Sequence, residues 1–406
     1  MVSMTDSTLL PTAPRTIPRD QHAISRKDIS PSALRVLYRL HEAGYGAYLV
    51  GGAVRDLLLG EHPKDFDIAT DATPEQVKHL FRNCRLIGRR FRLAHVVYGR
   101  EIIEVATFRA NSDDGSGDRE QDQEGRVLRD NVYGSIEEDA VRRDFTANAL
   151  YYAISDFSVR DYVGGFEDVN NRVMKLIGDP ETRYREDPVR MLRAVRLAAK
   201  LRFTIDPESA ERIPELASLL QEASSARLFE ETLKLFLSGH AEASFLGLEA
   251  HGLLAGLLPE TAAALASNRS GALRRMLLEG LRATDARIAA DEPVSPAFLF
   301  ATLLWHEVLR QWNAAKSRGE KPLPALFDAM DRVLGAQAER MSIPRRLEAT
   351  IKEIWTLQPR FEQRAGQRPQ HLLESPRFRM AYDFLALRAA SGEVPADIEV
   401  WWRTFQ

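Results

Sequence analysis

Two kinds of apolar pattern divide this 406-residue chain. Up to about residue 178, short apolar runs alternate with short amphipathic helical patterns, which is typical of a sheet covered by helices. Beyond residue 182, nearly every apolar pattern has the helical period, as in residues 187–201, 225–239 and 295–312. The pattern therefore predicts an α+β protein, with an α/β head followed by an all-helical remainder.

Turn and capping residues set the boundaries of the elements expected in the head. A Ser or Thr stands before three helical patterns and predicts where each helix begins: Ser30, Thr73 and Ser135. Helices are expected over residues 31–43, 53–60, 73–83 and 135–153, the last with a break at Asp144. Strands are expected at residues 46–51, 65–70, 85–88, 93–99 and 101–108, and a last pair at 159–165 and 173–178.

Composition narrows the class of protein. No run of about 18 apolar residues exists, so no membrane-spanning helix is expected. Residues 1–30 lack the pattern of a signal peptide and are rich in Pro, Ser and Thr, which predicts a disordered segment. Residues 110–125 are polar and predict a mobile loop. Cys84 is the single cysteine, which excludes an internal disulfide and favours a reducing cytoplasm.

Positive charge is concentrated in two segments, although the net charge is only -3. Seven arginines lie within residues 82–109 and seven cationic residues lie within residues 183–202, each segment with two carboxylates. Such clusters are typical of surfaces that bind polyphosphates, and solvated charged faces are the alternative interpretation.

Carboxylates two residues apart are the strongest candidate for chemistry. If residues 65–70 form a strand, Asp65 and Asp67 point to the same face about 6.6–6.8 Å apart. Mg²⁺ relieves the repulsion between such carboxylates, and Glu104 in another apolar strand could complete a site for two ions. One ion would activate an attacking hydroxyl and the other would neutralise a leaving pyrophosphate. Asp144 competes as the third carboxylate, and it could instead cap the following helix.

A glycine pair indicates a phosphate site. Gly51 and Gly52 follow a strand and open a helix, so that their N–H groups and the helix N-terminus can approach a phosphate. The pair matches neither the P-loop nor the dinucleotide-binding pattern, and a tight structural turn is the alternative. Arg55, on the first turn of this helix, could contact a phosphate, whereas Asp56 is expected to form a salt bridge.

A second polar stripe lies at the start of the helical remainder. Asp187 precedes Pro188 and could cap a helix, while Arg190 and Arg193 continue its face at spacings of three. A carboxylate beside a guanidinium can recognise the edge of a nucleobase without a template. An ion pair within the helix is the alternative.

The order of these motifs resembles the class II nucleotidyltransferases, the family of bacterial poly(A) polymerases and tRNA CCA-adding enzymes. The matching segments are LVGGAVRDLLLG, DFDIAT, EVATFR, RRDFTANAL, DYVGG and REDPVRMLRAVRLAAKL, within residues 45–205. LIGRRFRLAHVVYG, RLFEETLKLF and the C-terminal residues look like the poly(A) polymerase branch.

The resemblance implies a polymerase-beta-like head with a mixed sheet at residues 31–178, a helical neck at 179–260 and a helical body at 261–406. It implies template-independent addition of AMP from ATP to RNA 3′ ends, with two Mg²⁺ ions. The implied metal ligands are Asp65, Asp67 and Glu104, with Asp144 also catalytic. The implied nucleotide-binding residues are Gly51, Gly52, Arg55, Asp56, Arg142, Arg143, Asn148, Asp187, Arg190 and Arg193.

Two other functions remain open at the level of sequence. A tRNA CCA-adding enzyme uses the same chemistry with CTP and ATP, and a non-catalytic RNA-binding protein could keep the fold. The implied partners are mRNA, decay intermediates and small RNAs, with the RNA-degradation machinery as a possible protein partner. Members of the poly(A) branch often continue into a basic tail, which the residues up to Gln406 do not include.

Candidate RNA surfaces lie in both helical regions. They are residues 183–202 and a set of C-terminal arginines, Arg345, Arg346, Arg360, Arg364 and Arg368. Three tryptophans could stack on bases. These are Trp355, Trp401 and Trp402, for which packing in a core is the alternative interpretation.

Overall fold

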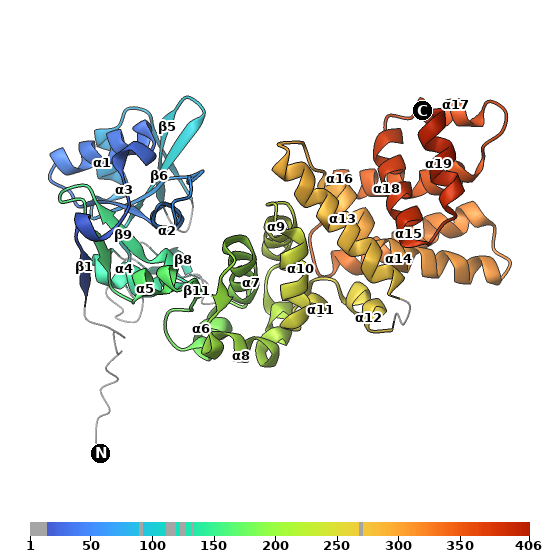
Figure 1. The fold of residues 1–406 in the computed structure, drawn as a ribbon. Helices are drawn as coiled ribbons and strands as arrows, with labels where there is room; N and C mark the ends of the chain where they lie inside the picture. The colour runs from blue at the N-terminus through green and yellow to red at the C-terminus, as the bar shows by residue number, and fades with distance from the viewer. Residues whose placement is uncertain (1–13, 89–91, 111–118, 122–126, 131–132, 268–270) are drawn as a thin grey trace, which may run out of the picture. The chain divides into compact units, whose positions relative to one another are not determined.

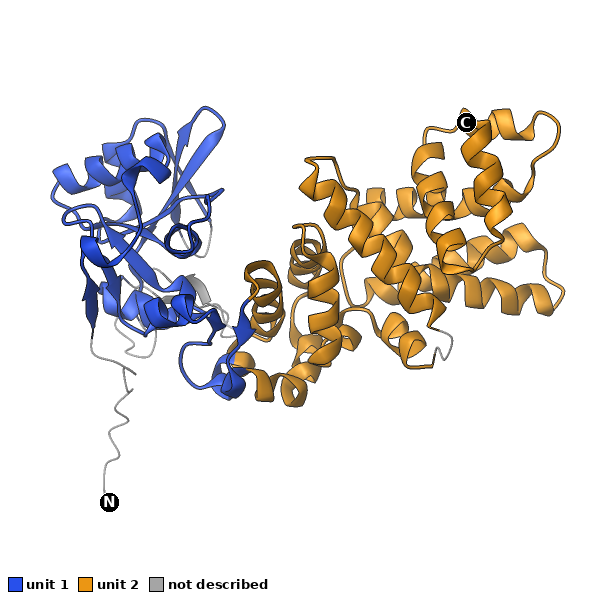
Figure 2. Cartoon of the chain, viewed as in Figure 1, with its two compact units in different colours: residues 1–183, 203–209 blue, residues 184–202, 210–406 orange. Residues whose placement is uncertain are grey.

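A computed structural model describes residues 14–88, 92–110, 119–121, 127–130, 133–267 and 271–406. The chain forms two compact units, residues 1–183 with 203–209, and residues 184–202 with 210–406 (Figure 2). The predicted head lies within the first unit. The division of the helical residues at 260 stays a prediction.

The first unit is built on a mixed sheet, as predicted. Among the described residues the sheet has eight strands in the order β1-β10-β9-β2-β3-β6-β5-β4. Only the central pair β3·β6 is parallel, and the other neighbours are antiparallel. The strands are β1 (Arg15–Ile17), β2 (Ala47–Val50), β3 (Asp67–Thr70), β4 (Cys84–Ile87), β5 (Leu93–Tyr98), β6 (Glu101–Thr107), β9 (Leu150–Ala153) and β10 (Val159–Asp161).

Short helices connect these strands (Figure 1). They are η1 (Arg19–Gln21), η2 (Arg26–Asp28), α1 (Pro31–Glu42), α2 (Gly52–Leu58), α3 (Pro74–Leu80), α4 (Ile136–Arg142), η4 (Thr146–Asn148), α5 (Gly165–Asn170) and α6 (Pro180–Glu186). The predicted capping is confirmed, because Ser30 caps α1, and Thr73 and Ser135 form capping boxes with Gln76 and Glu138. Helix α3 ends about three residues earlier than expected.

Two adjacent rows of residues cross the sheet and face opposite sides. One row is apolar and includes Ala94, Val105, Ile68, Leu49 and Tyr152, each at most 2% exposed. Helix α1 packs against β2, β3 and β6 on this side. Successive residues of a strand alternate between faces, so the neighbouring row points away from α1. That second row carries the polar groups of the candidate site.

The N-terminal prediction is wrong for residues 14–30. Arg15–Ile17 forms the edge strand β1, which pairs with β10. Three isoleucines from this segment are almost fully buried, namely Ile17, Ile24 and Ile29. Their burial supplies the free energy that orders a segment whose Pro and Ser content suggested disorder. The rest of that prediction, residues 1–13, lies outside the described residues.

The helix expected over residues 135–153 is also wrong in its second half. Helix α4 ends at Arg142, because Arg143 has an extended backbone. Residues Leu150–Ala153 form β9, which lies between β2 and β10, with all four side chains buried. A short run that is apolar on both faces shows no alternation, so its period alone cannot distinguish a strand from a buried helix.

Two further expectations for the head are corrected. The segments at 159–165 and 173–178 do not pair with each other, because α5 lies between them and β11 (Val173–Met174) pairs with β12 (Thr204–Ile205). The loop expected at 110–125 contains β7 (Arg119–Gln121), which pairs with β8 (Val127–Asp130). Residues 111–118 and 122–125 of that prediction lie outside the described residues.

The second unit is helical, as predicted (Figure 1). Its largest buried side chains include Trp305, Trp355 and Trp402. In the described part of the chain, no helix is long and apolar enough to cross a membrane. The helices that follow β11 are α7 (Val189–Leu201), α8 (Pro207–Leu216), η5 (Ala217–Glu222), α9 (Ser225–Phe236), α10 (Ala241–Ala250), α11 (Leu254–Leu257), α12 (Pro259–Ser267), α13 (Ala272–Ala289), α14 (Pro296–Ser317), α15 (Pro322–Ala338), α16 (Arg345–Leu357), η6 (Gln358–Glu362), α17 (Arg368–Leu373), α18 (Phe378–Ser391) and α19 (Ala396–Phe405).

Candidate active site

The parallel pair at the centre of the sheet brings two of the predicted carboxylates together. Asp67 at the start of β3 lies directly opposite Glu104 on β6. Neighbouring strands are about 4.8 Å apart, and opposite residues point to the same face, so the two side chains are neighbours. Strand β3 begins at Asp67 rather than at the predicted Asp65, which is exposed in the preceding loop. Phe66 between them is buried, as expected.

A histidine that the sequence analysis missed extends this row. His95 on β5 lies opposite Glu104, and its Nε2 is 3.3 Å from Oε2 of Glu104. With its proton on Nε2, the ring donates a hydrogen bond that orients the carboxylate. The alternation of LAHVVY places His95 on one face of the strand, but the sequence does not show which residue lies across from it.

The electrostatics of the carboxylates differ from those of isolated surface groups. The pKa of Asp67 rises from 3.8 to about 6, first because the surrounding protein desolvates the carboxylate and then because Glu104 and Asp65 are negative. Asp67 is nevertheless exposed, so a ligand can reach its carboxylate. Neighbouring carboxylates repel one another when they are ionised, and a bound cation relieves that repulsion.

The donor set fits Mg²⁺. Among the described residues, no group of three or more His, Cys, Asp or Glu side chains is placed to hold a metal ion, so the protein alone forms no metal cage there. Mg²⁺ does not need such a cage, because it is commonly bound by one or two carboxylates together with substrate phosphates and water. Asp65, Asp67 and Glu104 carry carboxylate oxygens, the ligand type that this ion prefers, and their role as metal ligands stays a prediction.

Metal binding at this cluster is expected to weaken in acid. Protonated Asp67 cannot bind a cation, so the apparent affinity for Mn²⁺ or Mg²⁺ falls up to about tenfold per pH unit below pH ~6 and levels off above pH ~7. Without metal, the same group contributes stability at low pH that is lost as the pH rises through about 6. Mn²⁺ titrations by electron paramagnetic resonance, without nucleotide, measure this dependence. An affinity that stays constant between pH ~5 and ~7 would contradict it, and Asp67→Asn should lack this dependence.

The glycine turn adjoins the carboxylates. Val50, the last residue of β2, lies opposite Asp67, so Gly51 and Gly52 follow at the same end of the sheet. Gly51 has φ 75° and ψ −136°, a conformation that a side chain strongly disfavours, and it caps α2. A side chain at Gly51 would also approach Nη1 of Arg143 to 3.6 Å. This backbone therefore lies open toward the guanidinium of Arg143.

A buried network holds Arg143 in place. Its Nε donates to the Tyr151 hydroxyl at 2.9 Å, and its Nη2 donates to Asp139 Oδ2 at 3.1 Å. The Tyr151 hydroxyl donates to the same oxygen at 2.6 Å. Burial raises the pKa of Tyr151 well above its ordinary value, which keeps this hydroxyl a donor. Tyr151 lies opposite Val50, so the network belongs to the row that contains Asp67. The sequence analysis missed both Asp139 and Tyr151.

Arg55 forms a separate buried contact under the glycine turn. Its side chain is 4% exposed, its Nε and Nη2 donate to Asp56 Oδ1 at 2.8 and 2.6 Å, and its Nη1 donates to Asn148 Oδ1 at 2.5 Å. The expected salt bridge of Asp56 is confirmed. Arg55 ties α2 to η4 in this arrangement, and its contact with a phosphate stays a prediction.

The other two residues of the Arg-Arg-Asp motif, Arg142 and Asp144, form hydrogen bonds with the backbone. Arg142 Nη1 donates to the carbonyl of Ala110. Asp144 accepts a hydrogen bond from the N–H of Phe145 at 2.9 Å, and its own carbonyl accepts one from Ile177. Asp144 lies outside the strands of the sheet, whereas Glu104 lies opposite Asp67. Glu104 is therefore the better candidate for the third carboxylate.

The predicted base-selecting residues lie in the second unit, at the junction of α6 and α7. Asp187 Oδ1 accepts a hydrogen bond from Val189 N at 3.2 Å, and its Oδ2 accepts one from Arg227 Nη2 at 2.7 Å. Arg190 donates to Glu186 Oε2 at 2.8 Å, one turn back. The carboxylate of Asp187 thus lies between two elements rather than in a simple pair within one helix. Arg193 is half-buried on the next turn of α7.

The tryptophans proposed for base stacking are mostly core residues. Trp355 and Trp402 are fully buried and donate hydrogen bonds to the carbonyls of Ala301 and Phe361. Trp401 is half-buried and stacks on Phe405 at 4.6 Å between ring centroids. The packing interpretation therefore holds for Trp355 and Trp402.

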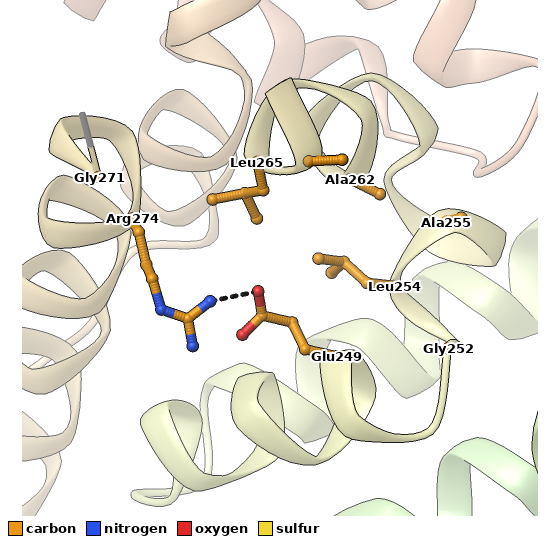
Figure 3. Close-up of a pocket in the computed structure, with 9 residues that line it drawn as sticks. Glu249, Gly252, Leu254, Ala255, Ala262, Leu265, Gly271 and Arg274 are labelled. Carbon is orange, nitrogen blue, oxygen red and sulfur yellow. Dashed lines mark hydrogen bonds and ion pairs between the residues drawn. The ribbon is translucent and has the colours of Figure 1, made fainter. Parts of the chain in front are cut away.

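The second unit contains a cavity of about 360 Å³ between α10, α11, α12 and α13 (Figure 3). Its lining is apolar apart from Glu249 and Arg274, whose Nη1 donates a hydrogen bond to Glu249 Oε1 at 2.5 Å. Glu249 is the one carboxylate in the described lining, and a guanidinium already pairs with it. The cavity therefore lacks the donor set that phosphoryl transfer requires, unlike the row around Asp67.

Comparisons with known proteins show which family the chain belongs to. A family model described as "Poly A polymerase head domain" matches residues 47–175, which include the carboxylates and the glycine turn. Models described as "Probable RNA and SrmB- binding site of polymerase A" and "Polymerase A arginine-rich C-terminus" match residues 202–265 and 318–406. Poly(A) polymerase I of Salmonella typhi is 53% identical over 399 residues, covering 96% of this chain and 85% of that relative. The chain belongs to the bacterial poly(A) polymerase family.

Other relatives are less similar, either in sequence identity or in the share of the chain that is matched. Poly(A) polymerase I of Haemophilus influenzae is 45% identical over 95% of this chain and 86% of its own length. The CCA-adding enzyme of Bacillus subtilis is 43% identical, but only over 52% of this chain and 50% of its own length. The chain is therefore a nucleotidyltransferase of the poly(A) polymerase type, and the CCA-adding enzymes are a more distant comparison.

Solved structures give the same fold. The CCA-adding enzyme of Bacillus stearothermophilus, in complex with CTP, has 28% identity and a TM-score of 0.61, covering 93% of this chain and 82% of that one. The Thermotoga maritima CCA-adding enzyme, complexed with tRNA, has 18% identity and a TM-score of 0.64, covering 96% and 85%. The predicted polymerase-beta-like head followed by helical domains is confirmed.

Proposed function

We propose that this chain transfers AMP from ATP to the 3′ end of RNA without a template and releases pyrophosphate. The observation that carries the proposal is the register of Asp67 with Glu104 beside the Gly51 turn, in a chain 53% identical to poly(A) polymerase I over nearly its full length. A bond forms between the RNA 3′ oxygen and the α-phosphorus of ATP. The bond from that phosphorus to the bridging oxygen breaks, and the hydroxyl proton is released with pyrophosphate.

In this proposal, the carboxylates of Asp65, Asp67 and Glu104 lie where the RNA 3′ hydroxyl reacts with ATP. Asp65, Asp67 and Glu104 would hold the two Mg²⁺ ions, which would supply Lewis-acid activation of the hydroxyl and charge neutralisation on the phosphates. His95 keeps the Glu104 carboxylate in one orientation through its Nε2 proton. Because the pKa of Asp67 is raised to about 6, this carboxylate is half charged near pH ~6 and fully charged only above pH ~7.

In this proposal, the triphosphate binds at the Gly51 turn and Arg143, next to the carboxylates. A side chain added at Gly51 would lie 3.6 Å from Arg143 Nη1, so the turn and the guanidinium are close together, and backbone N–H groups and a guanidinium are both suited to phosphate oxygens. Asp139 and Tyr151 act as positioning residues, because they fix the orientation of Arg143 before ATP arrives. Arg142, Arg55, Asp56 and Asn148 are also proposed to act in nucleotide binding; Arg55 does so together with Asn148, to which it donates a hydrogen bond.

Selection of the base is assigned to the second unit. Asp187, Arg190 and Arg193 combine carboxylate acceptors with guanidinium donors, the groups that can recognise the edge of adenine. Arg227 joins this set because it holds Asp187 Oδ2. RNA 3′ ends of mRNA, decay intermediates and small RNAs are the proposed substrates, in the cytoplasm, with the RNA-degradation machinery as a proposed protein partner.

A nucleotide-preference assay tests the proposed function. We expect long homopolymeric extension of a generic RNA with ATP alone, and little incorporation of CTP, GTP or UTP. A tRNA that lacks its 3′ end serves as the comparison substrate. If CTP is added to that tRNA and synthesis stops after one AMP, the chain is a CCA-adding enzyme. If no nucleotide is added to either RNA, the chain is a non-catalytic RNA-binding protein.

A further inference from the structure

A basic surface lies on the face of the sheet opposite to the carboxylates. Two adjoining depressions of about 430 and 580 Å³ flank α1 and share Leu34 and Tyr38 in their walls. Tyr152 lines the first depression, and it points away from the face on which Tyr151 meets Arg143, because neighbouring residues of β9 alternate. The two depressions are named the α1 groove, and they are separate from the site described above.

The charge of the α1 groove is strongly unbalanced. Within the described residues, none of its six cationic side chains forms an ion pair: Arg19, Arg26, Lys27, Arg35, Arg39 and Arg82. Some exposed arginines elsewhere pair with carboxylates, as Arg212 does with Glu215 and Arg318 with Glu320, so the lack of such pairs at all six positions distinguishes the groove from those sites. Glu42 is the one acidic residue in the described lining, although Asp20 and Asp28 lie on the adjacent short helices. Such an excess is typical of a surface that binds a polyanion.

Aromatic rings are interspersed among these cations. Tyr38 lies between the two depressions and Tyr98 lines the second, and both rings are half-buried. Arg26 donates to the Tyr38 hydroxyl at 2.6 Å and covers the ring of Phe157 at 4.5 Å. Cations for phosphates and partly exposed rings for bases together form the usual surface for single-stranded nucleic acid. An acidic protein segment would use the cations but would gain nothing from stacking on the rings.

We propose that the α1 groove binds single-stranded RNA upstream of the 3′ end that is being extended. This inference rests on the proposed function, because it takes RNA as the substrate. The groove would give RNA a binding surface on the head. This surface is distinct from residues 202–265, which match an RNA-binding family model. A longer RNA is then held at more points than a short primer that occupies only the catalytic face.

The double variant Arg35→Ala with Arg39→Ala tests the groove. Both side chains are exposed on α1 and have no recorded ion pair in the described chain, so the fold should tolerate the change. We expect the KM for an unstructured RNA of about 30 nucleotides to rise about tenfold, with kcat and the KM for a trinucleotide primer unchanged. The slope of log Kd against log salt for the long RNA should decrease by about 1.4. Tyr98→Leu should weaken long-RNA binding by about fivefold.

A matched variant separates the groove from net charge. Lys321→Ala with Arg332→Ala removes two exposed cations, one just before α15 and one on it, and should leave long-RNA affinity unchanged. The inference is overturned if the groove variant binds and extends long RNA as the unmodified chain does, which would leave an acidic protein as the occupant. Failure of the proposed function gives a different result, because the unmodified chain would then extend neither RNA.

Discussion

Asp67→Asn is expected to reduce AMP incorporation by at least about a thousandfold. The substitution keeps the size of the side chain but removes the charge that faces Glu104 across the parallel pair. No other carboxylate shares this position in the row, so the loss cannot be compensated by a neighbour. The measurement is single-turnover extension of an RNA primer with saturating ATP and Mg²⁺.

The fold should survive this change. The pKa of Asp67 is raised to about 6, so its charge costs stability at neutral pH and the neutral amide should be stabilising or neutral. Glu61→Gln is the matched control, because Glu61 is an exposed carboxylate in the loop before Asp65 and should retain full activity. Activity of Asp67→Asn within tenfold of the unmodified chain would remove this carboxylate from the mechanism.

Arg143→Lys is expected to lower kcat/KM for ATP by about a hundredfold. Lysine keeps the charge but cannot donate at once to Tyr151, to Asp139 and to a phosphate, as the guanidinium fork can. Arg143→Ala should show a similar or larger loss, with about 3–5 kcal/mol of lost stability, because buried Asp139 loses its ionic partner. Steady-state kinetics and thermal unfolding together measure both effects.

Two further variants identify the role of Arg143. Tyr151→Phe removes only the hydroxyl that orients the guanidinium, and it should raise the KM for ATP about tenfold with a smaller effect on kcat. Arg160→Lys is the control, because Arg160 lies opposite Tyr151 on β10 and pairs with Asp156 away from the glycine turn. If Arg143→Lys stays within twofold of the unmodified chain, Arg143 is a structural residue only.

Local signals in the sequence predicted the boundaries that depend on local chemistry. The Ser30 cap and the capping boxes at Thr73 and Ser135 form as expected, because each needs only residues within one turn. The strands at Ala47–Val50 and Glu101–Thr107 also agree with their apolar patterns. The order of the motifs was sufficient for the family, and hence for the polymerase-beta-like head.

Features that depend on long-range pairing were not predictable in this way. Leu150–Ala153 is buried on both faces of a central strand, so it has no alternation to distinguish it from helix. The pairing of β11 with β12 joins residues that are about thirty positions apart. Likewise, His95 and Tyr151 join the site only through the strand order, which determines that they share a row with Asp67.

The most direct test of the central claim is the position of the metal ion. A crystal of the protein with a non-hydrolysable ATP analogue and Mn²⁺ would locate the ion by its anomalous scattering. The account predicts Mn²⁺ in direct contact with the carboxylates of Asp65 and Asp67, with the triphosphate reaching the Gly51 turn and Arg143. An ion bound away from Asp65 and Asp67, with the nucleotide elsewhere on the head, would contradict it.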